Sequence, residues 1–275
     1  MSKVLITGSK GQLGTELAKL LSDAVLTDVG ELDITDFSAV SDFVKEKGID
    51  TIINCAAYTA VDKAEDEATL AEKINVTGPV NLAETGCKIV HISTDYVFDG
   101  KGHRPYVPED ETHPISVYGK TKRVGELGVL ENAKEAVVIR TAWLYSPYGN
   151  NFVKTMRRLG AEKETLNVVA DQIGTPTYAG DLAEAIVKIL PQITPETKGV
   201  YHFTNEGVCS WYDFATEIME QSGLACQVNP IPSSAYPTKA QRPFYSVLDK
   251  TKIKNTFGIQ ISHWKKGLEK CLKQL

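Results

Sequence analysis

Long apolar runs, paired cysteines and dense positive charge are all missing from this sequence. No run of about 18 apolar residues occurs, so we expect no membrane-spanning helix. The five cysteines are scattered and form no C-x-x-C pair, which indicates free thiols in a reducing compartment rather than disulfides or a zinc site. Residues 1–8 contain an apolar run that is far too short for a signal peptide. Together these absences predict a cytoplasmic protein.

The charge balance also excludes some functions. The formal net charge is −5 and no basic stripe stands out, so we expect no nucleic-acid partner. The 42% of hydrophobic and 24% of charged residues are typical of a soluble globular protein with a real core. With 275 residues, the chain is long enough for one large α/β unit or for two domains.

A glycine loop stands near the N-terminus, directly after residues 3–7, which have the apolar pattern of a buried strand. The loop carries Gly8, Gly11 and Gly14, and leucines at helical spacing follow it. Strand, glycine loop and helix in this order favour a dinucleotide-binding turn over a merely structural one. The glycines allow close backbone approach, and the helix N-terminus offers N–H groups to a pyrophosphate. The G-x-x-G-x-x-G spacing resembles that of the short-chain dehydrogenase/reductase superfamily.

An aspartate closes the second predicted strand, residues 25–27. A carboxylate at Asp28 can accept hydrogen bonds from the adenosine ribose and would repel a 2′-phosphate. No arginine or lysine follows until Lys45, so the sequence favours NADH over NADPH. The alternative is a solvated loop aspartate with no role in binding. Asp33 and Ile34 are expected to border the adenine.

Residues 50–55 form a further predicted strand, which ends at Ala56, Ala57 and Tyr58. In an open α/β sheet, ligands bind outside the carboxyl ends of the strands. Small side chains at such an end let a cofactor lie against the backbone. We therefore expect these three residues to contact the cofactor.

The predicted strand of residues 88–93 leads directly to Thr94, whose hydroxyl could hydrogen bond a substrate carbonyl. His91 lies inside the strand pattern, and we interpret it as structural. Asn75 lies among apolar neighbours, either as a satisfied buried amide or as the active-site asparagine found in the superfamily. Residues 100–114 hold glycine, proline and acidic residues, which predicts an exposed loop over the site.

Tyr118 and Lys122 are four residues apart in a segment predicted to be helical, so both side chains lie on one face. An ammonium group beside a phenol favours the phenolate. We therefore expect Lys122 to lower the pKa of Tyr118 and to prepare it for proton transfer to a carbonyl oxygen. The spacing alone also fits an ordinary charged surface helix; the glycine loop is what favours an active site.

Strands and helices alternate at short intervals in the first half of the chain, which predicts a doubly wound parallel sheet of the Rossmann type. We expect residues 1–146 to form a dinucleotide-binding domain. Residues 147–275 are expected to form mainly a smaller α/β substrate-binding part. Parts of residues 147–200 are expected to return to the first domain, so that the two parts interleave.

Several motifs together resemble the dTDP-4-dehydrorhamnose reductase family, and the likeness covers nearly the whole chain. They come in the expected order and are Thr94-Asp95-Tyr96-Val97-Phe98-Asp99-Gly100, Tyr118-Gly119-Lys120-Thr121-Lys122, Arg140-Thr141-Ala142-Trp143-Leu144-Tyr145, Asp171-Gln172-x-Gly174-x-Pro176-Thr177 and Arg242-Pro243-x-x-Ser246-x-Leu248. The glycine loop and the tyrosine–lysine pair are shared by the whole superfamily. The stretches that begin at Thr94 and Arg140 are therefore the discriminating ones.

The resemblance implies reduction of the 4-keto group of dTDP-4-dehydro-β-L-rhamnose to dTDP-L-rhamnose, a precursor of bacterial surface polysaccharides, with NADH or NADPH. Thr94, Tyr118 and Lys122 would be catalytic. The cofactor would contact Gly8, Gly11, Gln12, Leu13, Gly14, Asp28, Asp33, Ile34, Ala56, Ala57, Tyr58, Tyr118 and Lys122. The sugar nucleotide would contact Thr94, Asp95 and Trp143. We also expect Arg242, in a proline-rich loop, to reach the diphosphate as a bidentate donor.

The metal and two other functions stay open. Some family members form magnesium-bridged homodimers through surface carboxylates, and only Glu16 matches them here. A sugar-nucleotide epimerase or dehydratase would use the same tyrosine–lysine pair and would hold its NAD tightly through each cycle. A non-catalytic relative, like the regulatory subunit of methionine adenosyltransferase, would bind a nucleotide cofactor and a partner protein without turnover.

Overall fold

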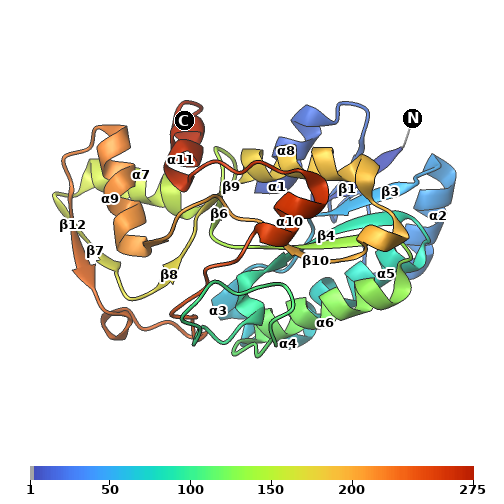
Figure 1. Ribbon diagram of the computed structural model, residues 1–275, viewed down its shortest axis with the longest axis horizontal. Helices are drawn as coiled ribbons and strands as arrows, with labels where there is room; N and C mark the ends of the chain where they lie inside the picture. The colour runs from blue at the N-terminus through green and yellow to red at the C-terminus, as the bar shows by residue number, and fades with distance from the viewer. Residues whose placement is uncertain (1–2) are drawn as a thin grey trace.

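The buried, β-branched segments of the sequence pair into one six-stranded sheet (Figure 1). The computed structural model describes residues 3–275. The strands of the sheet are β1 (Val4–Thr7), β2 (Val25–Thr27), β3 (Thr51–Asn54), β4 (Lys88–Thr94), β5 (Ala136–Thr141) and β10 (Gly199–His202). Their order is β2-β1-β3-β4-β5-β10, and every neighbouring pair is parallel. The prediction of a doubly wound parallel sheet is confirmed.

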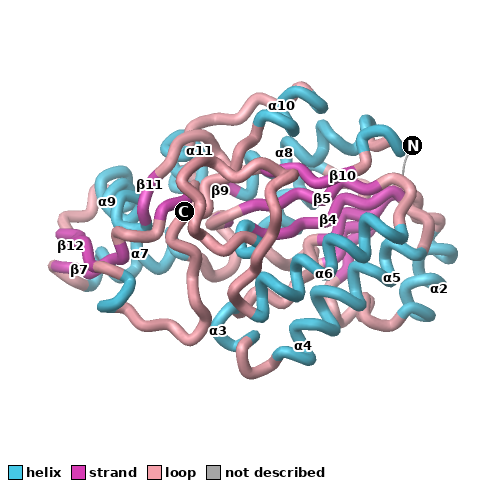
Figure 2. Tube along the Cα trace, turned by 60° about the horizontal axis from the view of Figure 1, so that its bottom comes forward, coloured by secondary structure: helices cyan, strands magenta, loops and turns pink. Residues whose placement is uncertain are grey.

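Helices cover both faces of this sheet (Figure 2). One face carries α1 (Gln12–Leu20), α8 (Ala179–Ile189) and α10 (Thr251–Phe257), and the other carries α2 (Phe37–Lys47), α5 (Gly78–Glu84) and α6 (Val117–Asn132). Successive side chains of a strand point to opposite faces. In β1, Val4 and Ile6 therefore enter the core that contains α1 and α8, whereas Leu5 enters the core that contains α2 and α5.

A smaller α/β part lies beside the sheet, at the left of Figure 1. Its elements are α7 (Phe152–Glu162), α9 (Trp211–Ser222) and α11 (Trp264–Leu272), with the parallel strand pair β7 (Thr165–Val169) and β12 (Gln227–Ile231). Two short pairs adjoin it, β6 (Leu144–Tyr145) with β9 (Thr177–Tyr178) and β8 (Ile173–Gly174) with β11 (Cys209–Ser210). Its core is separate from those of the sheet and includes Phe214, Trp264 and Leu268.

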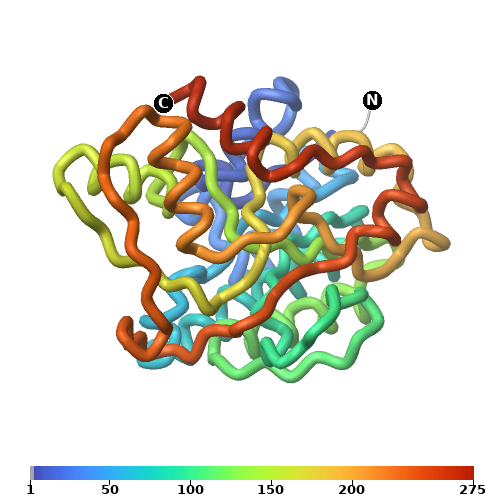
Figure 3. Tube along the Cα trace, turned by 60° about the vertical axis from the view of Figure 1, so that its left-hand side comes forward, coloured from blue at the N-terminus to red at the C-terminus, as the bar shows by residue number. Residues whose placement is uncertain are grey.

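The chain passes between the two parts more than once, as the colours of Figure 3 show. After β5 it enters the smaller part, and it then returns to the sheet with α8 and β10. It leaves again with α9 and returns with α10. A domain boundary at residue 146 stays a prediction. Between residues 3 and 275, no helix has both the length and the apolar character needed to cross a membrane.

Two short helices, α3 (Val61–Ala64) and α4 (Ala68–Glu72), follow β3 and lead through a π-helical turn, Lys73–Thr77, into α5. This turn buries Asn75 completely. The Asn75 amide nitrogen donates to the carbonyl oxygen of Tyr58 and to the hydroxyl of Thr121, both at 3.1 Å. Its amide oxygen accepts from the backbone N–H of Tyr58 at 2.9 Å. Asn75 is thus a satisfied buried amide that ties the end of β3 to α6.

The segment of residues 100–114 packs against the C-terminal part of the chain and not over the site. Tyr106 is buried and stacks on Phe98, with ring centroids 4.1 Å apart. Its backbone N–H donates to Val247 at 2.9 Å, and its carbonyl oxygen accepts from Asp249 at 2.8 Å. None of residues 100–114 lines the cleft described below. The prediction that this loop covers the site is wrong, because backbone pairing to a distant segment holds it elsewhere.

Candidate active site

The carboxyl ends of the central strands open into a cleft of about 740 Å³. Strand order reverses between β1 and β3, and open α/β sheets bind ligands in the crevice outside such a point. The cleft brings together residues from the glycine loop, the strand ends and α6. Of the predicted site residues, it is lined by Gly8, Gly11, Gln12, Leu13, Gly14, Asp28, Asp33, Ile34, Ala56, Ala57, Thr94, Asp95, Tyr118, Lys122 and Trp143.

The glycine loop is too tight for side chains at its two ends. Gly8 has a φ of +64°, and a Cβ atom there would lie 2.7 Å from the backbone nitrogen of Ala56. A Cβ atom at Gly14 would overlap the carbonyl oxygen of Gly8. Gly11 caps α1 without any side-chain hydrogen bond, so the first N–H groups of this helix can serve an anion. The loop therefore has the features of a pyrophosphate cradle.

Asp28 lies on the cleft wall at the end of β2. Its carboxylate accepts a hydrogen bond from the backbone N–H of Lys10 at 3.2 Å. The Lys10 ammonium pairs with Glu31 at 2.7 Å, and the Asp28 charge contributes to raising the pKa of Lys10, after the hydrogen bond and charge of Glu31. A cation thus lies beside Asp28. The sequence interpretation missed it because Lys10 precedes Asp28 and comes from the glycine loop.

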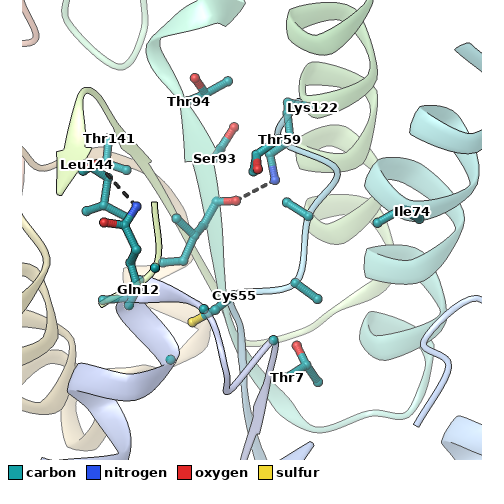
Figure 4. Close-up of a pocket in the computed structure, with 18 of the residues that line it drawn as sticks. Thr7, Gln12, Cys55, Thr59, Ile74, Ser93, Thr94, Lys122, Thr141 and Leu144 are labelled. Carbon is teal, nitrogen blue, oxygen red and sulfur yellow. Dashed lines mark hydrogen bonds between the residues drawn. The ribbon is translucent and has the colours of Figure 1, made fainter. Parts of the chain in front are cut away.

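Lys122 lies inside the cleft floor and is only 1% exposed. Its ammonium group donates to the carbonyl oxygen of Ile92 at 2.7 Å (Figure 4). Burial lowers the pKa of Lys122 from 10.5 to about 8, although the charge of Glu126 opposes the shift. The hydrogen bond joins α6 to β4 two residues before Thr94, so it fixes α6 against the strand end.

The electrostatics of Tyr118 differ from the prediction. Burial raises the pKa of Tyr118 above its ordinary value; a hydrogen bond with Thr94 opposes this, and the charge of Asp95 raises the pKa further. The Lys122 ammonium donates to Ile92 and does not offset these effects. The prediction that Lys122 lowers the pKa of Tyr118 is therefore wrong. Tyr118 keeps its proton at neutral pH and presents a hydroxyl donor to the cleft.

Asp95 follows β4 and begins a 3₁₀ turn, Asp95–Val97. Its carboxyl group is 2% exposed and accepts a hydrogen bond from the Thr94 hydroxyl at 3.1 Å on Oδ1. Burial raises the pKa of Asp95 from 3.8 to about 6. No hydrogen bond of good geometry reaches its other oxygen, Oδ2, although the Ser246 side chain lies close enough to the carboxyl group to oppose the rise in pKa. A buried acceptor of this kind on a cleft wall fits a ligand hydroxyl group.

Trp143 lines the cleft in an unusual backbone conformation. Its φ is +50°, and across residues 3–275 it is the one non-glycine residue with a positive φ. This left-handed conformation costs about 1–2 kcal/mol for an L-residue. The indole stacks on the ring of Trp211, with centroids 3.6 Å apart and an interplanar angle of 13°.

Tyr58 and Arg242 are the two predicted site residues that do not line the cleft. The Tyr58 hydroxyl hydrogen bonds to the carboxylate of Glu67. Arg242 donates to the Tyr96 hydroxyl at 2.9 Å and to Asp62 at 2.7 Å. Tyr96 itself lines the cleft, so Arg242 is one side chain removed from it. The roles of both residues stay predictions.

His91 agrees with its structural interpretation. It is fully buried in β4, and its Nδ1 lies 3.0 Å from the side-chain nitrogen of Asn54 on β3. The same asparagine accepts a hydrogen bond from the Thr7 hydroxyl at 2.8 Å on β1. These three side chains join neighbouring strands beneath the cleft.

The sequence interpretation missed part of the cleft wall. Some of these residues, including Tyr96 and Thr141, lie within the family motifs, so the motifs were a signal for them. Gly149 and Asn150 lie in a loop before α7 and carry no signal in the sequence. The missed lining residues are Thr7, Thr27, Val29, Leu32, Thr35, Cys55, Thr59, Val61, Ile74, Ile92, Ser93, Tyr96, Thr141, Ala142, Leu144, Gly149 and Asn150.

Glu16 does not provide a metal site within one chain. Its carboxylate is bound by the ammonium of Lys19 at 3.0 Å and by the hydroxyl of Tyr178 at 3.3 Å. In the described part of the chain, no group of three or more histidine, cysteine, aspartate or glutamate side chains could hold a metal ion.

Relatives of known name share both the sequence and the fold of this chain. The family model described as the RmlD substrate binding domain matches residues 2–275. A dTDP-4-dehydrorhamnose reductase from Aggregatibacter actinomycetemcomitans is 45% identical over 287 residues, which cover 98% of each chain. A crystal structure of a dTDP-4-dehydrorhamnose reductase from Clostridium acetobutylicum has a TM-score of 0.95, with 46% identity over 98% of each chain. A second crystal structure is that of a dTDP-4-dehydrorhamnose reductase from Bacillus anthracis in complex with NADP. It has a TM-score of 0.94, with 41% identity over 100% of each chain. The chain belongs to the dTDP-4-dehydrorhamnose reductase family.

Proposed function

We propose that this protein reduces the 4-keto group of dTDP-4-dehydro-β-L-rhamnose to the alcohol of dTDP-L-rhamnose, with NADH or NADPH. The observation that carries the proposal is the meeting of the glycine loop with Thr94, Tyr118 and Lys122 in one cleft. Relatives named dTDP-4-dehydrorhamnose reductase match 98% or more of the chain and support the substrate. The NADP complex of the Bacillus anthracis relative supports a nicotinamide cofactor.

The residues of the cleft fit such a cofactor along the carboxyl edge of the sheet. The start of α1 would hold the pyrophosphate, and Asp28 would accept hydrogen bonds from the adenosine ribose. Asp33 and Ile34 would border the adenine, and Lys122 would hold hydroxyls of the nicotinamide ribose. When bound, the cofactor supplies the hydride that the ketone carbon accepts.

Asp28 and Lys10 would together set the preference between the two nicotinamide cofactors. The Asp28 carboxylate favours a 2′-hydroxyl and repels a 2′-phosphate, which favours NADH. The Lys10 ammonium would attract the same phosphate, so we propose a modest preference for NADH with both cofactors used.

Tyr118 would supply the proton of the reaction. As its carbon is reduced, the ketone oxygen gains negative charge, and the Tyr118 hydroxyl donates its proton to that oxygen. The raised pKa of Tyr118 keeps the phenol protonated beforehand, and a developing alkoxide is basic enough to remove its proton. The Thr94 hydroxyl, which donates to Asp95 in this structure, would turn its O–H to donate a hydrogen bond to the same oxygen.

The sugar would lie between Asp95 and Trp143. The Asp95 carboxyl group, next to the Ser246 side chain, would accept a hydrogen bond from a sugar hydroxyl on Oδ2. The flat apolar indole of Trp143 would pack against the methyl group at C6 and turn the keto group toward Tyr118. Arg242 would act on the diphosphate only through a rearrangement of its pairing with Asp62.

An absorbance assay tests the proposal directly. The purified protein is mixed with dTDP-4-dehydrorhamnose and either NADH or NADPH, and the loss of reduced cofactor is compared with the amount of dTDP-L-rhamnose formed. Stoichiometric consumption of the cofactor supports the reductase. Turnover without net consumption, with NAD that copurifies with the protein, would instead indicate an epimerase or dehydratase. Cofactor binding without turnover would indicate a regulatory subunit.

A further inference from the structure

The Trp143 ring is bordered by two residues that have no part in the chemistry. On one side lies Trp211, the first residue of α9, whose ring is stacked at 3.6 Å. Gly174 of β8 also lies close to the indole. A Cβ atom at Gly174 would come within 2.8 Å of the Trp143 indole atoms Cε2 and Cζ2. Both residues therefore border the slot that the indole occupies.

The slot is built as one unit. Gly174 and Cys209 are paired in the short antiparallel ladder of β8 and β11, and β11 leads directly into Trp211. The Ser210 side chain caps α9 by accepting from the backbone N–H of Asp213 at 3.0 Å, and the Asp213 carboxylate accepts from the backbone N–H of Ser210 at 2.9 Å. This capping box fixes the start of the helix and so the direction of the Trp211 side chain.

The left-handed backbone of Trp143 is fastened by the same segment of the chain. The backbone N–H of Thr177 donates to the carbonyl oxygen of Trp143 at 3.2 Å. The Thr177 hydroxyl donates to the carbonyl oxygen of Ala142 at 2.7 Å and accepts from the Thr141 hydroxyl at 3.2 Å. A strained backbone persists only where its surroundings hold it, and such residues are concentrated at functional sites.

We propose that Gly174, Thr177 and Trp211 are positioning residues that hold the Trp143 indole as the wall of the sugar subsite. This proposal rests on the proposed reductase function. It also gives a role to the Asp171–Thr177 motif, which takes no part in the proposed chemistry. None of the three lines the cleft, so each acts on the substrate through Trp143. The smaller part of the chain thereby sets the orientation of the sugar, while the sheet holds the cofactor and the proton donor.

Steady-state kinetics of five variants test this role, with kcat and KM measured separately for dTDP-4-dehydrorhamnose and for NADPH. Trp211→Ala removes the stacking partner, and Gly174→Ala adds a methyl group that would lie 2.8 Å from the indole and 2.9 Å from the Ser246 hydroxyl oxygen. Each should lower kcat/KM for the sugar nucleotide about tenfold, since small misplacements of a substrate cost this much or more, while KM for NADPH changes less than about twofold. Trp211→Phe keeps a flat ring in the stack and should retain most of the activity.

Trp264→Leu is the matched control, because Trp264 is buried in the core of the smaller part, where its ring packs edge-on against Phe214. It should lower the melting temperature and leave kcat/KM of the folded protein unchanged. If Trp211→Ala, like Trp264→Leu, keeps the wild-type kcat/KM, then Trp211 does not position the indole. If Trp143→Ala has a lowered kcat/KM in the same experiment, the role of Trp143 as the wall of the sugar subsite remains supported. If Trp143→Ala itself keeps full kcat/KM, both the wall and its positioning residues are wrong.

Discussion

Glu126 accepts two hydrogen bonds from the guanidinium group of Arg140, through Nε and Nη2, each at 2.8 Å. Neither side chain is more than 1% exposed. Glu126 also accepts from the Ser93 hydroxyl at 2.5 Å, and Ser93 lies directly before Thr94. The ion pair therefore joins β4, β5 and α6 behind the cleft, and it fixes the strand end that carries Thr94 against the helix that carries Lys122.

Replacing Glu126 by Gln should destabilise the protein strongly. The variant leaves the Arg140 charge buried without its counter-ion, a change that costs about 3–5 kcal/mol in other proteins. The free energy of unfolding in urea measures the loss. Glu131→Gln is the control, because Glu131 lies on the exposed face of the same helix and should change stability by less than about 0.5 kcal/mol. Equal stability of the two variants would show that the buried pair contributes little.

The same pair predicts acid sensitivity. Burial would raise the pKa of Glu126, but the hydrogen bonds and charge of Arg140 outweigh burial and hold that pKa below the ordinary 4.5. A carboxyl group whose pKa is lower in the folded than in the unfolded protein stabilises the fold at pH values above its unfolded-state pKa. This stabilisation is lost as the pH falls through its folded-state pKa. Below pH 4.5, the free energy of unfolding should therefore fall more steeply for the wild type than for Glu126→Gln. Parallel pH dependences would contradict this assignment.

Lys122 should limit activity at alkaline pH. Burial lowers its pKa to about 8, so the ammonium that we propose for the nicotinamide ribose is progressively lost above that pH. We expect kcat/KM for NADPH to fall above pH of about 8. Lys122→Arg, whose guanidinium stays charged, should lose this alkaline limb. Tyr118→Phe should keep the alkaline fall in kcat/KM for NADPH, because the group that titrates is Lys122. If this fall is absent in Tyr118→Phe, the titrating group is the tyrosine.

The strand ends and the glycine loop were predictable from the sequence because their signals are local. The order of apolar segments and glycines places residues such as Gly8, Asp28 and Thr94 at the carboxyl edge of a parallel sheet, and the structure brings them into one cleft. The helical spacing of Tyr118 and Lys122 likewise fixes their common face. Periodicity and spacing are enough for this level of detail.

What the sequence could not give depends on distant segments. The pKa of Tyr118 is set by burial and by Asp95, so its direction could not be inferred from the lysine on the same helix. The positive φ of Trp143 is held by Thr177, which comes from another element. Lys10 reaches Asp28 only because the glycine loop folds back over β2. These contacts join residues that are far apart in the sequence and leave no local pattern.

We expect replacement of Asp28 and replacement of Lys10 to change the preference between NADH and NADPH in opposite directions. Asp28→Ala removes the carboxylate that favours a 2′-hydroxyl, so KM for NADH should rise more than KM for NADPH. Lys10→Ala removes a cation near the same position, so KM for NADPH should rise more than KM for NADH. The ratio of kcat/KM for the two cofactors measures both effects, and the Lys10 effect should weaken in high salt. Equal shifts in both KM values would show that these residues do not contact the ribose.

The central claim is that Tyr118 gives the proton to the ketone oxygen, and Tyr118→Phe tests it most directly. The variant keeps the ring that packs against Tyr96 at a centroid distance of 5.5 Å and removes only the hydroxyl. With dTDP-4-dehydrorhamnose as substrate, kcat should fall about 10²–10⁴-fold, the usual contribution of a positioned acid. The Kd for NADPH, measured by fluorescence titration, should stay within about twofold of the wild-type value. A variant that turns over at nearly the wild-type rate would contradict the account, because another group would then supply the proton.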